Sequence, residues 1–240
     1  MSAPATSPPP IGLKPRRIGR PRALHALAAL VFSSVAALGT IAVRGLYLGG
    51  QFYYRFLVWN LVLAWIPMVF AFAAYRHHAR GSRLNALLVG YVVAWFFFFP
   101  NAPYIVTDFI HLQHRPPVPL WYDLLLVASF AWTGLCLGYL SLYLMQEIAR
   151  ARFGPGRSWV FAVGMLFLGS VGIYAGRELR WNSWDVVRSP SHLLRGSLKI
   201  VEDADLHLGV VAFVGATFLF LLTTYCATFA LTHLHEEDVA

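Results

Sequence analysis

Charged residues are scarce in this sequence of 240 residues: Asp, Glu, Lys and Arg make up 12% of it, whereas soluble domains carry about 25%. Hydrophobic residues make up 58%, and the mean hydropathy is +0.59. This balance excludes an ordinary soluble domain, which could not keep so much apolar surface in water. The sequence therefore predicts an all-α, polytopic transmembrane helical bundle.

Cysteine is also scarce, with only Cys136 and Cys226 in the chain. Both lie inside apolar runs, so neither a disulfide framework nor a zinc motif is indicated, and we expect buried, unreactive thiols. No nucleic-acid motif accompanies the net charge of +8. Basic loops on the cytoplasmic side, in contact with anionic lipid, account for that charge. The expected partners are membrane lipids and, as an open alternative, other membrane proteins, but no nucleic acid.

Ionisable residues are almost absent from the middle of the apolar runs. Such residues usually mark the path of an ion or a proton through a membrane protein. Their scarcity argues against a proton-coupled pump or an ion channel, and the missing internal repeat lowers the case for a transporter. A permease for a neutral solute stays open, because its path needs no charge at mid-depth.

The apolar runs predict six membrane spans of about 20 residues each. A tail over residues 1–21, rich in proline and basic residues, precedes them and is expected to be disordered and cytoplasmic. The first run is long for a signal peptide and more spans follow it, so we expect it to be retained. The predicted membrane domain is 22–232, and 233–240 is a short acidic tail. The predicted spans are 23–43, 56–75 (kinked at Pro67), 84–99 (ended by Pro100), 120–145, 159–175 and 206–231.

The distribution of lysine and arginine predicts the orientation. With the N-terminus inside, the inside segments hold more Lys and Arg than the outside segments, and most of the outside ones lie in a single long loop. Because short loops carry most of the orienting signal, we expect both termini in the cytoplasm of a bacterial cell. Segments 100–119 and 177–205 then face outside the cytoplasmic membrane.

Polar side chains gather in segment 100–123, at the predicted outer interface. Asp108 and His111 are three residues apart, so they share one face of the short helix expected after Pro103, with Thr107 as a possible N-cap. Such a pair can orient an imidazole for acid–base catalysis or ligate a divalent metal, and it can equally be a structural hydrogen-bonded unit. The neighbours expected to bind a substrate are Asn101, Tyr104, Trp121, Tyr122 and Asp123.

A second polar segment, 177–185, follows the fifth span. Arg177 and Arg180 are three apart and flank tryptophans, an arrangement that suits a phosphate such as a lipid headgroup or a polyprenyl phosphate. Arginine and tryptophan also anchor spans without any further role. Asn182 and Asp185 are harder to explain as anchors. We predict that Asn182 binds substrate and that Asp185 joins Asp108 and His111 as a catalytic group; no metal ligands are assigned.

Small residues recur at helical spacing in two spans. Gly134 and Gly138 form one GxxxG pair, and Gly172 and Gly176 form another. Such pairs let helices approach closely. We expect them to pack helices within this chain rather than to form a dimer face.

These motifs resemble a bacterial membrane family catalogued as domain of unknown function 1361. The resemblance covers about residues 30–230 and excludes both tails. It implies an integral membrane protein of several helices, in bacteria, and assigns no activity or catalytic residue. The motifs that carry it are Phe99-Pro100-Asn101-Ala102-Pro103-Tyr104, Thr107-Asp108, His111-Leu112, Trp121-Tyr122-Asp123, Trp132-Thr133-Gly134 to Ser141, and Gly176-Arg177 with Arg180-Trp181-Asn182-Ser183-Trp184-Asp185.

Three functional hypotheses remain at this point. The first is an outward-facing polar cluster that binds, and in an enzyme modifies, a lipid or cell-envelope substrate. The second is a non-catalytic scaffold or partner subunit whose polar cluster ties the outer loops together. The third is the permease for a neutral solute. The sequence leaves enzymatic activity undecided and identifies no cofactor.

Overall fold

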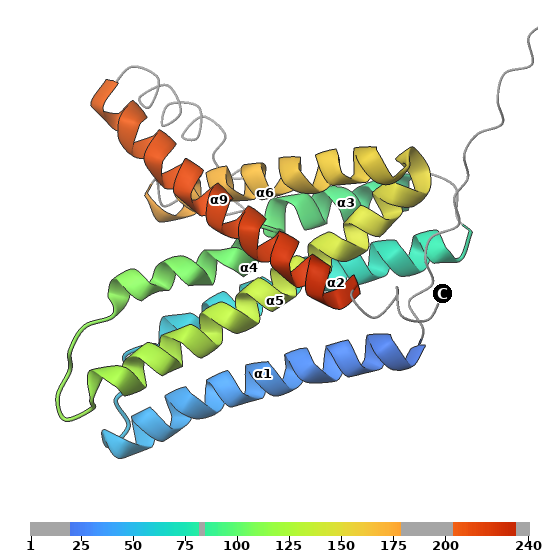
Figure 1. Cartoon of the computed structure of the whole chain (residues 1–240). Helices are drawn as coiled ribbons and strands as arrows, with labels where there is room; N and C mark the ends of the chain where they lie inside the picture. Colours follow the sequence, from blue (N-terminus) through green and yellow to red (C-terminus); the bar gives the residue numbers. More distant parts are fainter. Residues whose placement is uncertain (1–19, 82–84, 179–203, 234–240) are drawn as a thin grey trace, which may run out of the picture.

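The computed structural model describes residues 20–81, 85–178 and 204–233. They form a bundle of α-helices (Figure 1), which confirms the predicted all-α class. The elements are α1 (Arg20–Tyr47), α2 (Arg55–Ala79), α3 (Ala86–Phe98), α4 (Asn101–Tyr104), the 3₁₀ helix η1 (Ile105–His111), α5 (Leu120–Phe153), α6 (Pro155–Arg177) and α9 (Ala204–His233). Both predicted tails lie almost entirely outside the described residues.

Six segments of the described chain are long and apolar enough to cross a membrane, as predicted. Successive spans run in opposite directions, so α1 begins and α9 ends toward the same end of the bundle (Figure 1). Large apolar side chains such as Phe32, Val160 and Leu208 are more than 70% exposed. Lipid can cover them, and water cannot do so without a large free-energy cost. The central helix is α5. In its most apolar stretch, 61% of the residues are buried.

The third span is broken, and this break organises the bundle. Helix α3 has only 13 residues, about 20 Å at 1.5 Å per residue, which is short of the ~30 Å hydrocarbon core. The predicted end of this span at Pro100 was wrong, because the span continues after Phe99 through α4 and η1 to His111. Pro100 and Pro103 explain the break, because neither has an N–H to donate to the carbonyl four residues back.

The backbone carbonyls at the break find substitute donors. The Ala102 N–H donates to the Phe99 carbonyl at 3.2 Å, three residues back rather than four. That leaves the Phe98 carbonyl, which accepts from Asn101 Nδ2 at 3.1 Å. Asn101 therefore repairs the helix at the point where the prolines interrupt it, a requirement that is strict where no water is present.

Glycines of α5 and α6 cover the same break. A Cβ on Gly134 would lie 2.5 Å from the Ala102 carbonyl oxygen, and one on Gly172 would lie 2.6 Å from Pro100 Cγ. Gly138 faces Ala102 and Pro103 in the same way. The predicted role of the GxxxG pairs in packing within the chain is thus confirmed for Gly134, Gly138 and Gly172.

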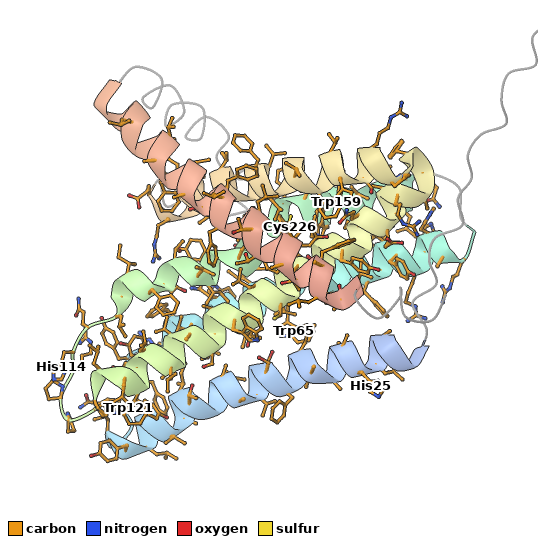
Figure 2. All side chains as sticks on the ribbon, viewed as in Figure 1. His25, Trp65, His114, Trp121, Trp159 and Cys226 are labelled. Atoms are coloured by element: carbon orange, nitrogen blue, oxygen red, sulfur yellow. The ribbon has the colours of Figure 1, made fainter. Side chains whose placement is uncertain are left out.

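Some local predictions were wrong. Thr107 is not an N-cap: it lies within η1, and its hydroxyl donates to the Tyr104 carbonyl at 2.7 Å. Cys226 is exposed on the outer surface of α9 rather than buried, whereas Cys136 is partly buried (Figure 2). The fourth span is longer than predicted, because α5 continues through a polar stretch to Phe153.

Substituting alanine for Gly134 or Gly172 should destabilise the protein. The added methyl group meets backbone or a proline ring, and overpacking of this kind costs about 1–3 kcal/mol. Thermal unfolding in detergent would measure the loss. Gly164→Ala, also on α6, is the matched control, since a Cβ there meets nothing within 4 Å and alanine favours a helix. Equal melting temperatures for Gly172→Ala and Gly164→Ala would contradict the packing role.

Candidate functional site

Two buried ion pairs lie at the same end of the bundle, where α1 and α6 end and where α2 and α5 begin. Arg177 pairs with Asp108, and Arg44 pairs with Asp123. His114 and Trp121 mark this end in Figure 2, opposite the end that carries His25. Asp108 and Asp123, both singled out in the sequence, therefore belong to different pairs.

The Asp108 carboxylate is held from two sides. Its Oδ2 accepts from Asn60 Nδ2 of α2 at 2.8 Å, and its Oδ1 accepts from Arg177 Nη1 of α6 at 3.2 Å. The side chain is only 1% exposed. Asp108 therefore joins three elements, α2, η1 and α6, through charge-assisted hydrogen bonds, which are stronger than neutral ones.

The Arg177 guanidinium lies against the inner face of α4 and η1. Besides Asp108, Nη1 contacts the Tyr104 hydroxyl at 3.2 Å, and Nη2 donates to the Thr107 carbonyl. Its Cζ lies 5.4 Å from the centre of the Tyr104 ring. Arg177 thus supplies donors to the end of the broken span, and its Nε–H takes part in none of these contacts.

His111 forms the exposed edge of this cluster. Its Nε2 lies 3.4 Å from Arg177 Nη1, and its ring packs edge-on against Phe56 with centroids 5.1 Å apart. Because a guanidinium can only donate, this contact requires Nε2 to be unprotonated. The predicted common face of Asp108 and His111 is realised in η1, because residues three apart align in a 3₁₀ helix.

Asp123 forms a separate pair with Arg44 instead of joining the Asp108 cluster. Arg44 Nε and Nη2 donate to the two carboxylate oxygens at 2.6 and 3.0 Å, a bidentate arrangement. Arg44 is 4% exposed and Asp123 is fully buried. A cation in the last turn of α1 and an anion in the first turn of α5 also match the dipoles of their helices.

Tyr54 completes the Arg44–Asp123 pair. Its hydroxyl donates to Asp123 Oδ2 at 3.3 Å, and the Arg44 Cζ lies 5.0 Å from the centre of its ring. Burial, and then the charge of Asp123, raise the pKa of Tyr54 to about 12. The phenol therefore keeps the proton that it donates throughout the physiological pH range.

The structure places the other predicted site residues as follows. The Tyr122 hydroxyl donates to the Thr40 carbonyl of α1 at 2.9 Å. Trp121 is 61% exposed on the outer surface of α5, a position typical of an interfacial anchor. Asn101 lies at the helix break. Arg180, Asn182 and Asp185 lie outside the described residues.

Sequence reasoning missed Arg44, Tyr54 and Asn60. Arg44 was treated only as an orienting charge, and nothing in the local pattern links it to Asp123, 79 positions later. Asn60 interrupts the apolar stretch 56–74 of α2. This was the one available signal, because an amide at this depth needs a partner.

Among the described residues, no three His, Cys, Asp or Glu side chains gather as a metal site would require.

The fold and this end of the bundle define a polytopic α-helical membrane protein with paired buried charges at one interface. Residues 59–224 match the family described as "Protein of unknown function (DUF1361)", and the chain belongs to this family. The match is narrower than the 30–230 expected and excludes α1. No curated protein and no solved structure matches the chain.

Removing one partner of the Arg44–Asp123 pair should destabilise the protein more than removing both. Arg44→Met leaves an uncompensated buried carboxylate, at a cost of about 3–5 kcal/mol, whereas Arg44→Met/Asp123→Leu leaves none. Unfolding of the single and double variants in detergent micelles would measure the difference. A double variant that loses the sum of the two single losses would show that the two side chains act independently.

Proposed function

We propose that this protein resides in the bacterial cytoplasmic membrane with both termini inside, and that the Asp108–Arg177–His111 cluster faces outward. The bias of lysine and arginine toward segments on the side of the termini supports this orientation. The cluster lies at one end of α6. Arg157 lies in the first turn of α6, at the opposite end, and belongs to one of the basic segments on the side of the termini.

We further propose that the cluster binds the phosphate group of a lipid or cell-envelope substrate. The observation that carries this proposal is the placement of Arg177: its guanidinium is fixed by Asp108 and by the Thr107 carbonyl, yet it adjoins the exposed His111. A planar guanidinium whose orientation is already fixed binds a phosphate with little loss of side-chain freedom.

The residues then have different roles. Asp108 is buried and fully engaged, so it positions Arg177 instead of touching the substrate. Arg177 and His111 contact the phosphate. His111 is the group placed for proton transfer if the substrate is modified, because it is an exposed imidazole directly beside Arg177.

A non-catalytic scaffold is the second candidate. The observation that favours it is that the hydrogen bonds of Asp108 and Arg177 tie α2, η1 and α6 together. In that case Asp108 and Arg177 matter for folding, and the exposed His111 does not matter for any ligand.

Cysteine labelling tests the orientation. In a variant in which alanine replaces both native cysteines, His114→Cys should react with a membrane-impermeant maleimide added to spheroplasts. Arg157→Cys, exposed at the opposite end, should react only after the membrane is opened. The reverse pattern would place the Asp108 cluster on the cytoplasmic side and overturn the proposed topology.

The site is tested by adding a polyprenyl phosphate to the purified protein and measuring its binding by native mass spectrometry. His111→Ala should weaken binding about tenfold, as expected for the loss of a hydrogen bond to a charged group, without changing the melting temperature. His114→Ala is the matched control, three residues further along and also exposed. Unchanged binding in His111→Ala, together with a large loss of stability in Asp108→Asn, would favour the scaffold.

A further inference from the structure

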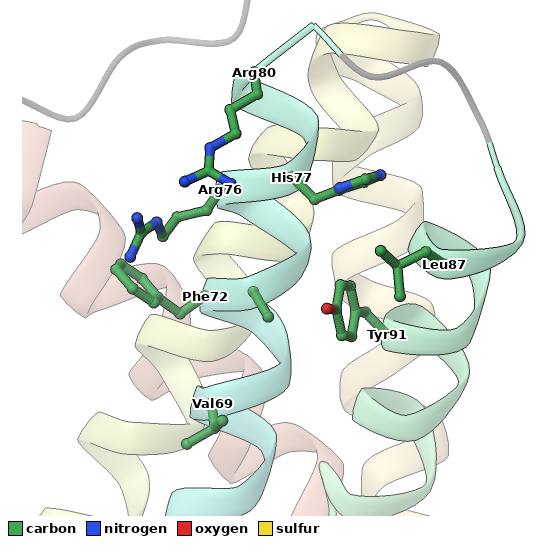
Figure 3. A pocket seen from close by; sticks show the side chains of 8 residues that line it. Val69, Phe72, Arg76, His77, Arg80, Leu87 and Tyr91 are labelled. Carbon is green, nitrogen blue, oxygen red and sulfur yellow. The ribbon is translucent and has the colours of Figure 1, made fainter.

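A groove lies between α2 and α3 at the end of the bundle opposite the Asp108 cluster. Its volume is about 420 Å³, within the range of small-molecule sites. Figure 3 shows Arg76, His77 and Arg80 at its upper end and the apolar Phe72 and Val69 below them. Leu87 and Tyr91 of α3 form the facing wall.

The upper end of the groove concentrates positive charge. Arg76 lies in the last turn of α2 and Arg80, four residues later, is the C-cap of that helix, so the two like charges lie close together and repel. Neither forms an ion pair with a carboxylate within the described ranges. Both side chains are exposed, and the N-terminal end of α3 adds a partial positive charge nearby. A bound anion would relieve this repulsion.

The walls of the groove are fixed. The His77 ring donates through Nε2 to Asn85 Oδ1 at 3.1 Å, and the same oxygen accepts from the Leu88 N–H at 3.0 Å as the N-cap of α3. His77 therefore links the end of α2 to the start of α3.

The lower part of the groove is apolar. Val69 is 59% exposed and Phe72 is 41% exposed. Val69 lies seven residues before Arg76 on α2, about 10 Å along the helix axis. Positive charge at the interface with apolar surface directly below it matches a phospholipid, whose phosphate lies above its acyl chains. A water-soluble anion would make no contact with the apolar part of the groove.

We propose that this groove binds one anionic phospholipid, with its phosphate between Arg76 and Arg80 and an acyl chain along Phe72 and Val69. Basic pockets between transmembrane helices bind headgroups of this kind. The Phe72 ring, 5.5 Å from the Arg76 Cζ, holds that guanidinium at the rim of the groove. This site is independent of the Asp108 cluster and of the proposed function.

The test uses the full chain in neutral detergent, titrated with phosphatidylglycerol and, separately, with phosphatidylcholine of the same acyl chains, and read by native mass spectrometry. The wild-type protein should bind phosphatidylglycerol at least tenfold more tightly than phosphatidylcholine. Arg76→Gln/Arg80→Gln should lose about tenfold of the affinity for phosphatidylglycerol, since each interfacial charge contributes substantially. Arg76→Lys/Arg80→Lys should keep most of it.

Arg55→Gln/Arg157→Gln is the matched control, because it removes two exposed arginines outside the groove. Equal binding of phosphatidylglycerol by this control and by Arg76→Gln/Arg80→Gln would overturn the proposal. So would equal affinity of the wild type for the two lipids. Displacement of phosphatidylglycerol by glycerol 3-phosphate at a similar concentration would show a site for soluble anions instead. His111→Ala should leave binding at the groove unchanged, which separates this site from the outward-facing one.

Discussion

The structure depends on one constraint: inside a bilayer, a backbone carbonyl or N–H without a partner costs several kcal/mol. The third span meets this constraint poorly, because Pro100 and Pro103 remove two donors in the middle of it. Asn101 supplies one substitute donor, and the close approach of α5 and α6 encloses the rest of the break in protein. That approach is possible only because Gly134, Gly138 and Gly172 lack side chains at the contact.

The break also fixes where the polar cluster forms. Helix α6 packs on Pro100 through Gly172 and ends five residues later at Arg177, about 7 Å further along its axis. The third span continues from Pro100 through α4 and into η1, and the long Arg177 side chain reaches Asp108 and His111 there. The glycine contact and the ion pair are therefore parts of one arrangement. A change in the angle of α6 would move the guanidinium away from the carboxylate.

The sequence predicted the features that depend on local pattern. The six spans were predicted from the lengths of the six apolar runs, and the end of α3 was predicted from the two prolines after it. Both features can be read from neighbouring residues, because span length and a missing N–H are local properties. The common face of Asp108 and His111 followed for the same reason. The partner of Asp123 did not, since Arg44 lies on a different helix and no pattern in either helix encodes their contact. Asn60 was overlooked because its role appears only once α2 is packed against η1.

Both ion pairs join an arginine to an aspartate, yet their surroundings separate their roles. The Arg44–Asp123 pair is bidentate, closed by Tyr54 and removed from solvent on both sides, which leaves it nothing to offer a ligand. The Arg177–Asp108 pair is single-contact and 10% exposed at the arginine, and it ends at the exposed ring of His111. The Arg177 guanidinium is held by Asp108 and the Thr107 carbonyl and adjoins an exposed imidazole, and a guanidinium fixed in this way suits anion recognition. The proposed anion site therefore rests on Arg177 and His111, whereas Arg44 with Asp123 holds α1 to the start of α5.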